Sequence, residues 1–185
     1  MATPAVPVMK LQHIIGLPVL ISHTGRMAGR IKDAWFDEHW KLKGFVLDGW
    51  CWKPRTVRTV LWDEVLTCGE DCVFIRGKES VRTAKVSIAQ RSFLNGCVRL
   101  KDLPVVTAGG SQLGRVSDVY IDPFLGTQLV GFELTDGFVS DLMDGRRWLR
   151  APRDSDVFLL GEDAIIVPTM DESSLERVAA SDPYM

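Results

Sequence analysis

The sequence predicts an all-β protein made of two small β-barrels in tandem, with short helical segments. Three observations lead to this fold class: an internal repeat, short apolar segments separated by turn residues, and a break in the apolar alternation at the same place in both halves. The chain has 185 residues, so each half lies near the lower size limit for a domain with a single core. Two small modules therefore fit the length.

The repeat is clearest between residues 29–37, Gly-Arg-Ile-Lys-Asp-Ala-Trp-Phe-Asp, and residues 114–122, Gly-Arg-Val-Ser-Asp-Val-Tyr-Ile-Asp. Four further landmarks keep the same order in both halves: Leu-Pro-Val at 17–19 and 103–105, glycine at 25 and 110, Gly-Phe-x-Leu at 44–47 and 131–134, and Gly-Glu-Asp at 69–71 and 161–163. The spacing changes between landmarks, where loops accept insertions. The pattern indicates duplication of a β-rich module of roughly 75 residues.

Each half divides into short strands bounded by glycine and polar turn residues, as in small barrels and sandwiches. The first half predicts strands at Val19–Ile21, Met27–Phe36, Lys43–Asp48, Thr56–Leu61 and Val73–Ile75. The second half predicts strands at Val105–Thr107, Leu113–Ile121, Gln128–Thr135, Arg147–Arg150 and Ala164–Val167. Between the first two strands, Gly25 suits a tight turn because glycine adopts positive φ.

The long second strand of each half breaks the period of two that a regular strand requires. After Ile31 the apolar series continues at Ala34 and Phe36, and after Val116 it continues at Val119 and Ile121. One extra residue in the strand produces such a slip, so we predict a β-bulge at Lys32-Asp33 and at Ser117-Asp118. A bulge lets a long strand turn the corner of a barrel. The same pattern predicts a core made of Val19, Ile31, Phe36, Phe45, Leu47, Val65 and Phe74, matched by Val105, Val116, Ile121, Phe132, Leu134, Val157 and Ile166.

Together these landmarks resemble the PRC-barrel, the fold of the cytoplasmic domain of the photosynthetic reaction centre H subunit and of the C-terminal part of the ribosome maturation factor RimM. The resemblance implies a first PRC-like barrel at 11–77 and a second at 97–168, joined by a linker at 78–96. The prolines near the start predict a disordered lead at 1–10, and residues 169–185 form a tail. Residues 136–146 look typical of the second barrel of tandem bacterial PRC-barrel proteins. The motifs specify fold rather than function, because their glycines and aspartates shape turns.

Composition excludes several classes. The net charge is −2, which argues against bulk attraction to nucleic acid or anionic lipid. No apolar run approaches the roughly 20 residues of a membrane-spanning helix, and the first residues lack a signal-peptide pattern; we expect a cytoplasmic protein. The four cysteines, Cys51, Cys68, Cys72 and Cys97, have no counterparts in the other half. They are expected to be reduced, with no metal site and no cofactor.

No catalytic constellation is present, and we expect that the protein is not an enzyme. Asp33 with Asp37, and Asp118 with Asp122, recur in both halves. A glycosidase-like pair of acid and base is one interpretation. The other is structural: Asp33 and Asp118 accept backbone hydrogen bonds at the bulges, and Asp37 and Asp122 begin turns. The three histidines form no triad pattern.

The candidate partner-binding residues are aromatic and basic: Trp50, Trp52, Lys53, Arg55, Arg58, Arg146 and Arg147. Exposed aromatic rings with arginine neighbours are typical of interface hot spots. A role in packing between the barrels, or in stacking on RNA, is the alternative for the tryptophans. For the arginines the alternatives are a solvated, salt-bridged surface and a contact with RNA or with phospholipid headgroups, as in peripheral membrane association. Residues 138–144 predict an amphipathic turn that caps a barrel or docks a partner, and residues 173–180 a short helix.

The combined expectation is a non-enzymatic adaptor or assembly module that presents barrel surfaces to a protein partner. The alternative is an RNA-binding or ribosome-assembly factor related to the RimM barrel. A flat apolar face would favour the first, and a basic face would favour the second.

Overall fold

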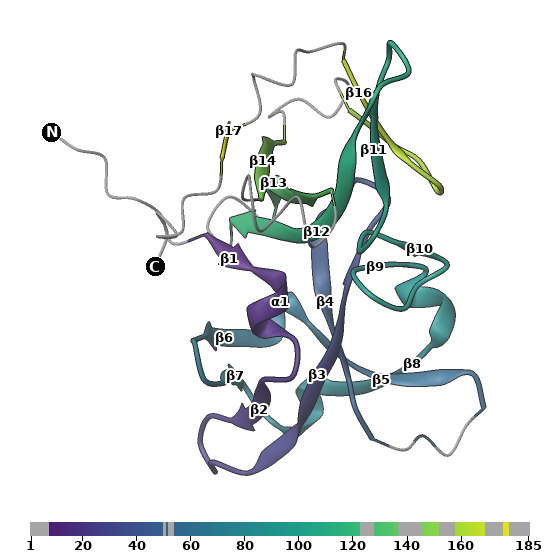
Figure 1. The fold of residues 1–185 in the computed structure, drawn as a ribbon. Helices are drawn as coiled ribbons and strands as arrows, with labels where there is room; N and C mark the ends of the chain where they lie inside the picture. Colours follow the sequence, from purple (N-terminus) through teal and green to yellow (C-terminus); the bar gives the residue numbers. More distant parts are fainter. Residues whose placement is uncertain are drawn as a thin grey trace, which may run out of the picture. The chain divides into compact units, whose positions relative to one another are not determined.

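A computed structural model describes residues 8–49, 51, 54–122, 128–136, 146–151, 158–168 and 176–177 (Figure 1). The chain divides into two compact units. The first unit is Leu11–Val98, and the second unit combines Met1–Lys10 with Arg99–Met185. Both units are built mainly from curled β-sheets, which confirms the predicted all-β, barrel-like fold class.

In the first unit the sheet has the strand order β6-β7-β2-β3-β4-β5-β8. Its elements are α1 (Leu11–Ile14), β2 (Pro18–Ile21), β3 (Met27–Phe36), β4 (Leu42–Leu47), β5 (Thr56–Leu61), the 3-10 turn η1 (Trp62–Glu64), β6 (Val65–Cys68), β7 (Val73–Ile75), η2 (Lys78–Ser80), β8 (Val81–Lys85), η3 (Val86–Ala89) and β9 (Arg91–Ser92). The short strand β10 (Val98–Arg99) pairs with β9, which also pairs with β3.

In the second unit the order is β15-β16-β11-β12-β13-β14-β17, and β1 pairs with β12. The strands are β1 (Met9–Lys10), β11 (Pro104–Thr107), β12 (Gln112–Asp122), β13 (Gln128–Thr135), β14 (Arg147–Arg150), β15 (Leu159–Leu160), β16 (Ile165–Val167) and β17 (Glu176–Arg177). The connectivity matches that of the first unit, down to one parallel pairing in each: β2 with β7, and β11 with β16. The expectation of like connectivity in the two halves is confirmed.

Both predicted bulges are present. The register between β3 and β4 shifts between Ile31 and Asp33, and the register between β12 and β13 shifts between Val116 and Asp118. Each aspartate accepts a hydrogen bond of 2.8 Å from the backbone N–H of the next residue. The carboxylates therefore fix the bulges, as the structural interpretation of these residues predicts.

The predicted domain boundaries need correction. Residues 78–96 are not a linker: β8 pairs with β5, and β9 pairs with β3. β8 lies at the end of the sheet order, where its charged side chains discourage pairing with other chains. Within the predicted disordered lead, Met9–Lys10 forms β1; residues 1–7 lie outside the described residues.

Most of the predicted core is buried, including Val19, Ile31, Phe36, Phe45 and Leu47 in the first unit and Val105, Val116, Ile121, Phe132 and Leu134 in the second. Three assignments are wrong: Val65 and Phe74 are half-buried, and Ile166 is 38% exposed. In the three-residue strands β7 and β16 the flanking residues point inward instead: Val73, Ile75, Ile165 and Val167. A strand this short has too few alternations to fix which face is buried. Val157 lies outside the described residues.

The C-terminal tail also differs from expectation. Glu176–Arg177, in the centre of the predicted helix, forms β17 and pairs with β14. Pairing with an existing sheet supplies hydrogen bonds that a short isolated helix lacks. The remainder of 173–180, and the predicted amphipathic turn at 138–144, lie outside the described residues.

Candidate functional site

A groove of about 1200 Å³ opens in the first unit. Its lining comes from β3, β4 and β5, from the segment between β4 and β5, from η3, and from the loop that follows β9. It is larger than the roughly 300–1,000 Å³ of most small-ligand pockets. The size suits an extended chain segment better than a compact metabolite.

The loop on one side of the groove is held by Asp33, which is 3% exposed. Beyond its bond at the bulge, the carboxylate accepts hydrogen bonds from Ser92 Oγ at 2.9 Å and from the backbone N–H groups of Leu94 and Asn95 at 2.9 and 2.7 Å. The Asn95 side-chain amide adds a further bond of 3.1 Å. With this many donors, Asp33 is a structural anchor and not a free general base.

Another part of the lining is fixed by Arg58. Its guanidinium donates to the carbonyl oxygens of Asp48 and Ala28 at 2.8 and 2.6 Å. Asp48 in turn accepts from the backbone N–H of Arg30 at 2.8 Å, and its Oδ1 lies 3.0 Å from where a Cβ on Gly29 would be. Because Gly29 also has φ +152°, a larger residue is excluded there on two grounds.

The second unit repeats this clamp. Arg147 donates to the carbonyl of Leu113 at 2.6 Å and bonds the Asp136 carboxylate, which lies against Gly114 with φ +140°. Arg58 and Arg147 therefore support the sheets, an assignment that sequence reasoning missed. The signal was present in the sequence, because an aspartate after the third strand precedes an arginine at the fourth in both halves.

Two cations on the groove lining remain open to a ligand. Lys32 and Arg55 are exposed, and within the described residues neither forms a hydrogen bond or ion pair through its side chain. The two carboxylates of the lining, Asp33 and Asp48, are already bonded to donors of the unit itself. The groove thus offers uncompensated positive charge, and electrostatic complementarity favours an acidic ligand.

Apolar side chains and thiols complete the lining. Val86 is 48% exposed, Val57 is half-buried and Val46 is buried. Cys97 is exposed and Cys51 half-buried. The lining thus combines an apolar surface with the exposed cations Lys32 and Arg55.

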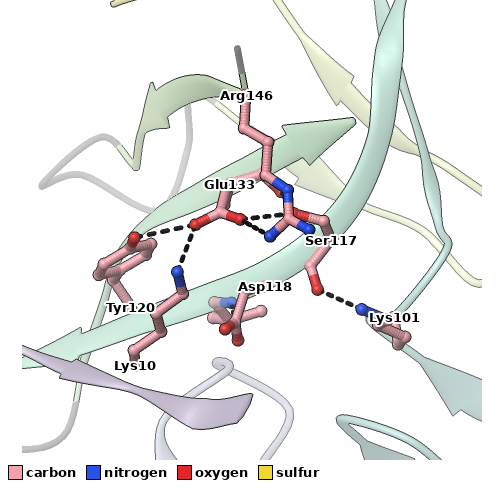
Figure 2. A network of polar contacts seen from close by, with 8 residues as sticks. Lys10, Lys101, Ser117, Asp118, Tyr120, Glu133 and Arg146 are labelled. Carbon is pink, nitrogen blue, oxygen red and sulfur yellow. Dashed lines mark hydrogen bonds and ion pairs between the residues drawn. The ribbon is translucent and has the colours of Figure 1, made fainter. Parts of the chain in front are cut away.

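The second unit contains a buried charge network centred on Glu133, whose residue is 1% exposed (Figure 2). The carboxylate forms an ion pair with Lys10 Nζ at 2.7 Å and another with Arg146 at 2.5 Å, and accepts from Tyr120 Oη and Ser117 Oγ, each at 3.0 Å. Burial alone raises the pKa of Glu133, but these donors and the Lys10 charge outweigh it and lower the pKa to about 2. The residue is ionised at neutral pH.

The predicted site residues are therefore divided between the units. Arg55 and Arg58 line the groove of the first unit. Arg146 and Arg147 belong to the second unit, where they bond Glu133 and Asp136. Trp50, Trp52 and Lys53 lie outside the described residues. Lys32 and Glu133 were not predicted as site residues, because Lys32 was assigned to the bulge and Glu133 occupies the variable position of the Gly-Phe-x-Leu landmark.

Among the described residues, no group of three or more His, Cys, Asp or Glu side chains is placed to hold a metal ion. In the same part of the chain, no helix has the length and apolar character to cross a membrane. Asp37 accepts hydrogen bonds from the backbone of His39 and Lys41 at 2.9 and 3.0 Å, so it shapes a turn, as the structural interpretation predicts.

The cysteines give a chemical test of the groove. Burial, together with the neighbouring Cys72, raises the pKa of Cys68 to about 11. At pH 8 Cys68 is a protonated, unreactive thiol, whereas Cys97 is exposed on the groove. Iodoacetamide is expected to label Cys97 well before Cys68, as followed by peptide mass spectrometry. Equal labelling at pH 8 would contradict the burial of Cys68.

Comparison with known families supports part of the sequence interpretation. Residues 95–173 match the model of the PRC-barrel domain. No curated protein matches the chain. The match falls mostly within the second unit. The resemblance of residues 11–77 to the same family stays a prediction that rests on the repeat.

Proposed function

We propose that the protein is a non-enzymatic adaptor built from two PRC-like barrels, and that the first unit binds an acidic, extended segment of a partner protein in its groove. The supporting observation is the groove itself, where Lys32 and Arg55 border an apolar lining. The PRC-barrel match adds a small β-barrel module and no catalytic chemistry.

The alternative proposal, an RNA-binding or ribosome-assembly role, predicts a different ligand for the same cations. Phosphate contacts supply most non-specific affinity for RNA, and such affinity falls steeply with salt. The net charge of −2 and the apolar part of the lining favour a peptide. We expect no tight binding of duplex or structured RNA at physiological salt.

The test compares two charge-reversed variants of the whole chain. Lys32→Glu with Arg55→Glu places acidic groups on the groove, whereas Lys41→Glu with Lys43→Glu makes the same change of net charge at exposed positions outside the lining. The probe is a fluorescent eight-residue peptide of alternating glutamate and valine. The groove variant is expected to bind it at least about tenfold more weakly than the native chain, and the control variant about as well.

Two further measurements distinguish a peptide ligand from an RNA ligand. Binding of the peptide should slow the labelling of Cys97, because this thiol lies on the groove. Equal loss of binding in both variants would show only a net-charge effect and contradict the groove assignment. Sub-micromolar binding of a single-stranded RNA 12-mer that weakens steeply with salt, and is lost in the groove variant, would replace the peptide proposal with the RNA one. With a confirmed groove, capture from the native cell with and without nuclease identifies the partner.

A further inference from the structure

The second unit is completed by a strand that precedes the first unit in the sequence. β1 pairs antiparallel with β12, with Met9 opposite Ile121 and Lys10 opposite Tyr120. Residues 11–98, the whole first unit, intervene between this strand and the rest of the second unit. The strand is therefore held in place by contacts rather than by a local turn.

The first unit fills the corresponding place from its own sequence. β9 pairs with β3 at Trp35 and Phe36, which the repeat matches to Tyr120 and Ile121. In both units a cation of the added strand lies over an aromatic ring: Arg91 is 5.9 Å from the centroid of Trp40, and Lys10 is 5.5 Å from the centroid of Tyr120. Both units thus receive a short strand at the same place, but the register of the cation differs: Lys10 lies opposite Tyr120, whereas Arg91 lies opposite Phe36 and Ser92 opposite Trp35.

In the second unit, the buried carboxylate of Glu133 lies beside this position and requires a cation there. The Lys10 ammonium lies 2.7 Å from Glu133 Oε2, with 17% of the lysine side chain and 1% of the glutamate side chain exposed (Figure 2). A buried carboxylate that loses a partner is left with uncompensated charge. If this position held an acidic or apolar residue, Glu133 would lose its ion pair with Lys10 and keep, among the described residues, the ion pair with Arg146.

We propose that the edge of β12 at Tyr120–Ile121, with Glu133 beside it, is a binding site for a short extended segment bearing an ammonium group, and that the segment Met9–Lys10 is its ligand in this chain. Backbone hydrogen bonds hold the segment, as in the addition of a strand to a sheet edge, and Glu133 reads the side chain. The site is separate from the groove, so the proposal stands independently of the proposed function.

The first experiment uses hydrogen exchange on the whole chain, resolved by peptide. Lys10→Met keeps the length of the side chain and removes its charge, and Lys10→Arg restores the charge. Lys10→Met is expected to speed exchange of the Val119–Ile121 amides about tenfold or more while leaving β3 and β4 unchanged, because local opening follows the loss of local contacts. Arg91→Met, which removes the cation of the strand added to the first unit, is the control and should speed hydrogen exchange of β3 alone.

The second experiment asks whether the site accepts its ligand from outside. In the variant Met9→Gly with Lys10→Gly, a synthetic peptide of residues 5–12 at millimolar concentration should shift the amide resonances of Tyr120 and Ile121. The peptide with Lys10→Glu should shift neither, and the native chain should be unaffected because its site is filled. Unchanged exchange in Lys10→Met, equal effects in both units, failure of Lys10→Arg to restore protection, or absence of peptide-induced shifts in the double variant would each overturn the proposal.

Discussion

Phe132→Ala is expected to lower the free energy of unfolding of the second unit by about 3–5 kcal/mol. Phe132 is 1% exposed and lies at the centre of the sheet, opposite Val119 on β12 and Leu149 on β14. Truncation removes the apolar area of the ring and leaves a cavity that the surrounding strands fill only in part. Denaturant unfolding followed by hydrogen exchange, which separates the two units, measures the loss.

Phe45→Ala is the matched change in the first unit. Phe45 is fully buried, occupies the same landmark, and lies opposite Ala34 and Val60. It should destabilise the first unit by a similar amount. A loss below about 1 kcal/mol in either variant would show that the phenylalanine does not support its sheet as the burial indicates.

Acid is expected to weaken the second unit over the range in which Glu133 takes up a proton. The pKa of Glu133 is lowered from 4.5 to about 2 in the folded protein. Its stabilisation is therefore fully present above about pH 4.5 and is lost as the pH falls towards 2. The size of the shift corresponds to about 3 kcal/mol at neutral pH. Thermal unfolding from pH 6 to pH 2, followed by exchange protection of β12 and β13, measures this contribution.

Glu133→Gln isolates the contribution of this carboxylate from that of other acids. The variant should be less stable at pH 7, because Lys10 and Arg146 lose their anionic partner, and its stability should fall less between pH 5 and pH 2. If the native chain and the variant lose stability in parallel over this range, the acid sensitivity belongs to other groups.

The sequence predicted the features that repeat and missed those that occur once. The bulges at Asp33 and Asp118 and the shared strand order were visible because two copies carried the same irregularity. The partners of Asp33 were not visible, since Ser92 and Asn95 lie about sixty residues further along the chain in a segment without a matching landmark. Contacts at this separation leave no local pattern in a single sequence.

Charge was the least predictable property of the site residues. Arg58, Arg146 and Arg147 were chosen as partner-binding residues because basic side chains are usually exposed, yet each bonds a carbonyl or carboxylate of its own unit. Lys32 was not predicted as a site residue because it was assigned to the bulge, and the structure places this bulge residue on the lining of the groove. Whether a cation is free depends on three-dimensional neighbours, which composition and spacing do not record.

The position of β1 has a consequence for the order in which the protein is made. Met9–Lys10 is translated before residues 11–98, and its partners Tyr120 and Ile121 are translated only after them. When residues 11–98 have been made, the strands of the first unit can pair with one another, while Met9–Lys10 still lacks the strand with which it pairs. The second unit is thus closed by a strand made before the first unit, and trimming or capture of Met9–Lys10 in the nascent chain would leave β12 without this pairing.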